Sequence, residues 1–128
     1  MTGTAGGNIT PSSFVVRSTT ADAQYLLASG TSTPIVGISG AGTRYPPYGG
    51  LDDGNIAVAG ENFKVYQPPE KEAPLQLGGT VAAGDMLTSD ASGHGVTATA
   101  GQQVGARALE AGVSGSIITV QPVWGPRD

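Results

Sequence analysis

Short apolar runs separated by turn-forming residues recur along the whole chain. They are most regular in the last third, where strand-like runs cover Leu75–Leu77, Met86–Ser89, Val96–Thr99, Val104–Leu109 and Ser116–Val123. The residues between these runs are mainly Gly, Asp and Ser, which turns select. Short strands at regular spacing predict an all-β fold, a small β-barrel or sandwich with long loops, whose compact module spans residues 75–123.

One of these runs predicts cover on both sides of its sheet. Val104, Ala106 and Ala108 share one face of the predicted strand, and Arg107 and Leu109 share the other. Successive side chains of a strand point to opposite faces, so both faces of this strand are expected to be at least partly covered. No internal repeat and no heptad pattern is visible in the chain.

The first half of the chain contains further strand candidates. They are Phe14–Arg17, Ile35–Ile38, Ile56–Ala59 and Phe63–Tyr66. The last two are separated by Gly60-Glu61-Asn62, a connection of hairpin length. Residues 67–74 are polar and carry proline near both ends, which predicts an extended connector outside any β-ladder.

Residues 21–28 have two interpretations. Thr20 is a good N-cap, so the segment could form one short helix. A strand carrying Tyr25, Leu26 and Leu27 is the alternative, because periodicity does not decide over so short a run.

The first twelve residues are mostly Gly, Thr, Ser and Asn. Such a composition buries little apolar surface, which predicts a flexible, extended N-terminal arm over residues 1–12. The remainder, residues 13–128, has the size of a single β-rich domain.

Composition favours a subunit that neighbours cover. Charged residues make up 12% of the chain, and 21 Gly and 9 Pro favour turns and irregular backbone. Surfaces poor in charge lose little desolvation energy on being covered. The net charge of −4 argues against nucleic acid as a partner, because phosphate contacts require clustered Lys and Arg.

Compartment and membrane signals are few. The chain has no cysteine, which excludes disulfides and a thiolate nucleophile but says nothing about redox compartment. No apolar run approaches the ~20 residues that span a bilayer, and the start carries no signal-peptide pattern. We therefore expect synthesis in the cytoplasm and no membrane partner.

Catalytic candidates are weak. The single histidine, His94, lies between Asp90 and Gly95 in a sequence typical of a turn, and no Gly-x-Ser-x-Gly elbow accompanies it. The glutamates are scattered along the chain, so no carboxylate pair for acid–base chemistry is visible. The glycine-rich segment from Gly37 to Gly42 lacks the Lys-Ser/Thr and the helix of a phosphate loop. The protein is not expected to be an enzyme.

Two further clusters contain side chains of the kind found in binding sites. Asp52, Asp53 and Asn55 place oxygen ligands together, but they lack the calcium-loop spacing and its distal Glu, so a turn is the better interpretation and neither a metal nor a cofactor is expected. Arg44, Tyr45 and Tyr48 form either an aromatic interface loop or a loop packed on its own domain.

The last third resembles the capsid decoration, or cement, proteins of tailed bacteriophages. The matching segments are Ala83-Gly84-Asp85-Met86-Leu87, Asp90 to Gly95, Val96 to Gly101, Val104 to Ala111 and Ile117 to Val120. The resemblance implies a β-tulip-like barrel that binds the outer surface of the virion capsid, usually as a homotrimer. Its partner would be the major capsid protein, whose subunit contacts it would stabilise; a dimer is the alternative oligomer.

This interpretation places the capsid-binding residues in the arm. They are Thr2, Thr4, Asn8, Ile9 and Thr10, in a segment that would lie along a capsid protein and add a strand to an exposed edge. The alternative is a carbohydrate- or receptor-binding β-module of a phage fibre or tail, with the tyrosine loop stacking on sugars. A small trimeric barrel enzyme is a third interpretation.

Overall fold

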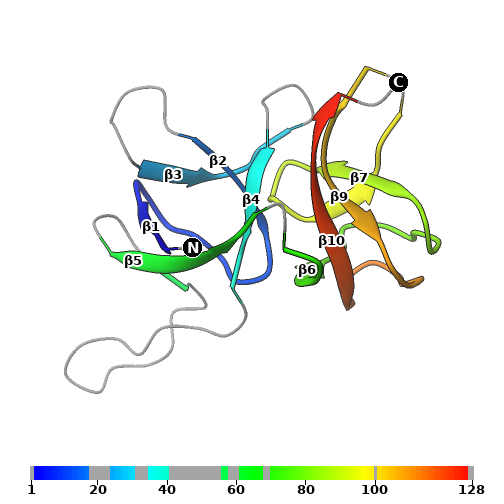
Figure 1. Ribbon diagram of the computed structural model, residues 1–128, viewed down its shortest axis with the longest axis horizontal. Helices are drawn as coiled ribbons and strands as arrows, with labels where there is room; N and C mark the ends of the chain where they lie inside the picture. The colour runs from blue at the N-terminus through cyan, green and yellow to red at the C-terminus, as the bar shows by residue number, and fades with distance from the viewer. Residues whose placement is uncertain are drawn as a thin grey trace.

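The structure is a computed structural model, and it describes residues 2–17, 24–30, 35–40, 56–57, 61–67, 70–99 and 101–126. These residues form two adjoining β-structures, a closed five-stranded barrel and a five-stranded sheet, joined near the central strand β4 (Figure 1). No helix occurs among the described residues. The predicted all-β fold class is therefore confirmed.

The first barrel is built from the N-terminal half of the chain. Its strands are β1 (Thr2–Ala5), β2 (Phe14–Arg17), β3 (Gln24–Leu27), β4 (Ile35–Ser39) and β5 (Asn62–Tyr66). They close in the order β1-β3-β2-β4-β5. Val15, Val65 and Ile9 are fully buried inside, and Tyr25 packs edge-on against Phe63 with ring centroids 6.2 Å apart.

The segment expected to be a flexible arm is part of this barrel, so that prediction is wrong. Strand β1 pairs in parallel with β3 and antiparallel with β5. Ala5 and Ile9 are both fully buried, and Ile9 forms a bridge with Ala57. The small residues of this segment need little apolar surface of their own, because partners distant in sequence supply the pairing and the cover.

Of the two interpretations of residues 21–28, the strand is confirmed and the helix is wrong where the structure describes the segment. Residues Gln24–Leu27 form β3, with Tyr25 buried and Leu26 exposed in the alternation of a strand. Pairing on both sides, with β1 and β2, decides between the two local preferences. Of the predicted hairpin around residues 56–66, β5 is confirmed, and residues 58–60 lie outside the described part.

The second sheet contains the five strands predicted from the apolar runs. They are β6 (Ala73–Gln76), β7 (Met86–Ser89), β8 (Gly95–Thr97), β9 (Gln103–Ala108) and β10 (Ile117–Pro126), in the order β6-β10-β9-β7-β8. A parallel bridge from Leu77 to Gly95 connects its two edge strands. The sheet therefore curls around a core that contains the fully buried Leu75, Leu87 and Val120.

Pro74 corrects the prediction that proline keeps the connector out of a ladder. It lies in edge strand β6 and is paired with Thr119 of β10. The neighbouring Gln76 donates its N–H away from β10, to the carbonyl of Ser12. Alternation places the nitrogen of Pro74 on that same outer edge, where its missing N–H costs no bond within the sheet.

The second sheet contains two segments that have similar structures but different sequences. The N–H of Gly84 bonds to the carbonyl of Ala108, and 31 positions further along, the N–H of Gly115 bonds to the carbonyl of Leu77. Val81 and Gly112 exchange both of their hydrogen bonds. Residues 73–89 and 104–120 are thus two similar halves related by an approximate twofold axis.

The tight turn in each half contains a glycine with positive φ. The φ angle is +93° at Gly84 and +89° at Gly115, within turns closed by bonds from Asp85 to Ala82 and from Ser116 to the carbonyl three residues before it. Side chains other than glycine rarely adopt this backbone conformation. In the aligned halves only Gly84 with Gly115 and Thr88 with Thr119 are identical, which is why no repeat was visible in the sequence.

The two β-structures are joined through tight packing around Gly105. A Cβ at this position would lie 2.6 Å from Cγ2 of Ile35 and 2.7 Å from Cε1 of Phe14. The N–H of Phe14 also donates to the carbonyl of Gly93 at 2.8 Å. The prediction that β9 is covered on both faces is confirmed at Gly105, although Arg107 further along the same face is exposed.

A buried hydroxyl network fixes the turn that leads into β2. Oγ of Ser39 accepts the N–H of Ser13 at 3.0 Å and donates to the carbonyl of Thr10 at 2.7 Å. Ser12 is held at a φ of +52°, which costs a non-glycine residue about 1–2 kcal/mol. The carbonyl of Ser12 accepts the N–H of Gln76. This turn therefore also connects the barrel to the second sheet.

Replacing Ser39 by alanine is expected to destabilise the fold by about 1–3 kcal/mol, because the buried N–H of Ser13 loses its acceptor. Urea unfolding followed by circular dichroism measures the change. Thr97→Ala is the control, since it removes a hydroxyl on an exposed residue and should change stability by no more than about 0.5 kcal/mol. Equal stability of the two variants would contradict a structural role for the network.

Candidate functional site

The residues expected to bind a capsid do not form an arm. Asn8 is exposed, Thr4 and Thr10 are partly buried, and Ile9 is fully buried in the first barrel. Thr2 lies in strand β1. Ile9 therefore contributes to the core of the barrel, whereas Thr4, Asn8 and Thr10 retain exposed surface.

Several other candidates lie outside the described residues. These are the tyrosine loop with Arg44, Tyr45 and Tyr48, and the acidic turn with Asp52, Asp53 and Asn55. In the described ranges no group of three or more His, Asp or Glu side chains is placed to hold a metal ion. Likewise, no helix within those ranges is long and apolar enough to cross a membrane.

His94 is a turn residue, as its sequence context predicted. Oδ1 of Asp90 accepts the N–H groups of Ser92 at 2.8 Å and of His94 at 3.0 Å. Gly93, with a φ of +81°, completes the turn between β7 and β8. The histidine thus belongs to a hairpin connection that Asp90 organises.

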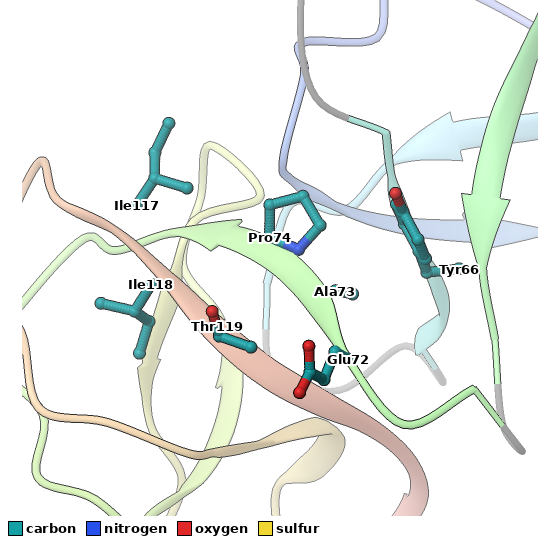
Figure 2. A pocket seen from close by; sticks show the side chains of 7 residues that line it. All are labelled: Tyr66, Glu72, Ala73, Pro74, Ile117, Ile118 and Thr119. Atoms are coloured by element: carbon teal, nitrogen blue, oxygen red, sulfur yellow. The ribbon is translucent and has the colours of Figure 1, made fainter.

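A groove of about 330 Å³ lies on the outer face of the second sheet, beside the end of β5. It is lined by Tyr66, Glu72, Ala73, Pro74, Ile117, Ile118 and Thr119. Figure 2 shows Tyr66 on one side of the groove and the residues of β6 and β10 on the other. Apolar side chains with a carboxylate and a hydroxyl at the border are typical of a binding surface for another molecule.

One face of the Tyr66 ring, which lines the groove, is in contact with a lysine side chain. Nζ of Lys64 lies 4.7 Å from the ring centroid of Tyr66, within cation–π distance. Gln67, the next residue after Tyr66, donates from Nε2 to the carbonyl of Val36 at 3.0 Å. The side of the groove formed by Tyr66 is therefore anchored to the first barrel.

Of the five exposed large apolar side chains among the described residues, four lie in or beside strands of the second sheet. Ile117 is 60% exposed, Val113 57%, Leu109 44% and Met86 37%; Leu26 of the first barrel is the fifth large apolar side chain in this class. Ile117 lies in the groove, and Val113 lies in the turn before β10. These exposed side chains could not be predicted from the sequence, because a strand pattern shows which residues alternate but not which face of the sheet is uncovered.

The two-part β-fold is shared with a protein of a bacteriophage head. The structure is similar to the N base of the head fibre gp8.5 of bacteriophage phi29, with a TM-score of 0.58 and 20% sequence identity, over 100% of this chain and 96% of that chain. At this identity the similarity shows a common fold. No protein-family model matches the sequence, and no curated protein matches it.

Proposed function

We propose that the protein is a structural component of a phage head and binds its outer surface. The observation that carries this proposal is the end-to-end fold similarity to the base of a phage head fibre. The low charge content and the exposed side chain of Ile117 in the groove support a role in which the protein is covered by a partner. No catalytic step is part of the proposed role.

In its finer form, the proposal is that the chain acts as a decoration protein that strengthens contacts between major capsid protein subunits, as a homotrimer. Many copies on one shell would gain from effective concentration, so weak individual contacts would suffice. The similarity to a fibre base supports a second candidate, in which the chain attaches a fibre to the head.

Co-sedimentation with expanded, empty heads of the source virus tests the common part of both candidates. We expect stoichiometric binding, and electron cryomicroscopy should then place the protein on the outside of the shell. Absence from the heads under conditions where the protein is folded would refute the proposal.

Heads that lack the protein separate the two candidates. A decoration role predicts a lower temperature of head disruption without the protein and its recovery on addition of purified protein. A fibre-base role predicts unchanged head stability and loss of a projecting fibre.

A further inference from the structure

The groove has a counterpart on the same sheet. In the two similar halves of the second sheet, Pro74 corresponds to Gly105, and Thr119 corresponds to Thr88. All four positions face the outer side of the sheet. Successive side chains of a strand alternate between faces, and the adjacent residues, such as Leu75 and Ile118, point into the core. The sheet therefore presents the same type of surface twice.

The counterpart surface is occupied within the chain. Ile35 and Phe14, carried by strands of the first barrel, lie against Gly105, and Thr88 is fully buried. In the part of the chain that the structure describes, the first barrel contributes only Tyr66 to the side of the groove, and Ile117 is 60% exposed. One half of the repeat thus shows what its outer face binds, namely bulky apolar side chains from β-strands.

We propose that the groove is the docking site for an aromatic or branched aliphatic side chain on an extended segment of a partner protein. This proposal rests on the proposed function in that the partner would be a protein of the phage head. Pro74 and Ile117 supply apolar contacts, while Glu72 and Thr119 lie where they can bond to backbone groups of the segment.

The contact is made by side chains and not by strand addition. Pro74 has no N–H to offer on the outer edge of β6, and Gln76 donates its own N–H to Ser12. A polypeptide is a better occupant than a sugar, because the described lining is mainly apolar and offers sugar hydroxyls only Glu72, Thr119 and the Tyr66 ring, one face of which Lys64 covers. Sugar stacking would use that ring.

A peptide from the chain itself provides a probe that needs no phage. A capped peptide of residues 12–17 carries Phe14 in the strand that covers the counterpart surface. In an NMR titration of the full chain, we expect shifts of the amides of Tyr66, Ile117 and Thr119, and none with a control peptide in which Phe14 is replaced by serine. Absence of groove shifts at millimolar peptide would overturn the proposal.

Two matched variants test the groove on the partner. Ile117→Asp places a charge in the groove, and Val113→Asp places one on a similarly exposed residue outside it. We expect Ile117→Asp to weaken head binding at least tenfold and Val113→Asp to leave it within twofold. Head binding that is equal in the two variants would overturn the assignment.

The remaining outcomes separate this inference from the proposed function. If the wild-type chain does not bind heads, the proposed function fails, and the peptide titration still decides the groove. A change in oligomeric mass caused only by Ile117→Asp, measured by light scattering, would replace the partner with a second copy of this chain. Glycan binding that Ile117→Asp abolishes would overturn the proposal in favour of a sugar site.

Discussion

Deletion of residues 1–12 is expected to abolish folding of the first barrel. The deletion removes strand β1, which pairs with both β3 and β5, and takes away the fully buried Ala5 and Ile9. Burial of an isoleucine side chain alone contributes about 1.5–3 kcal/mol, and the total stability of a small domain is about 5–15 kcal/mol. Loss of the strand also leaves two open edges in a closed barrel.

Thermal unfolding and amide hydrogen exchange measure this effect. The deleted chain should lose protection in β2 to β5, whereas Asn8→Ala, at an exposed position of the same segment, should unfold like the wild-type chain. A deleted chain with undiminished protection in the barrel would show that the segment is dispensable. If the barrel unfolds as expected, reduced head binding by this deletion would report a folding defect and not a lost arm contact.

Replacing Phe14 by alanine is expected to destabilise the protein by about 3–5 kcal/mol, the usual cost of truncating a buried phenylalanine. The side chain is fully buried where the first barrel meets the second sheet, and it lies against Gly105. The cavity left by the substitution cannot close easily, because its neighbours Ile35 and Gly105 are held in strands of two separate sheets. Urea unfolding monitored by circular dichroism measures the change.

A double-mutant cycle with Gly105→Ala tests whether the loss of stability arises from packing of Phe14 against Gly105. In the wild-type chain, the added methyl group would meet Phe14 and Ile35, which predicts a cost of about 1–3 kcal/mol from overpacking. In the Phe14→Ala background one of the two obstacles is gone, so the cost should fall. Strictly additive effects would contradict direct packing between these positions.

Much of the second sheet could be predicted from the sequence. Each apolar run from Leu75 onward corresponds to a strand, because glycine, Asp and Ser end the runs at turns such as those at Gly84, Gly93 and Gly115. The turn role of His94 followed from the same local chemistry. These features depend on residues close together in the chain, for which sequence patterns are informative.

The first barrel was less predictable from the sequence. The strand at Gln24–Leu27 and the ordered position of Thr2–Ala5 both depend on pairing with segments distant in sequence. Locally, the first has an N-cap signal and the second a composition typical of disorder. The candidate site was missed for a related reason, since the groove combines Tyr66 with Ile117 and Pro74 from strands of two different sheets.

The sequence by itself determined the all-β class, the strands after residue 75 and the turns that separate them. Local backbone preferences of glycine, Asp and Ser, together with alternating apolar residues, are sufficient for these features. Only the tertiary structure decided that the N-terminal segment closes a barrel, and that two similar halves with different sequences in the second sheet are related by an approximate twofold axis. It also decided that the described residues leave one outer face of this sheet uncovered. Those features follow from long-range hydrogen bonds and from the packing of Phe14 and Ile35 on Gly105, which no local pattern encodes.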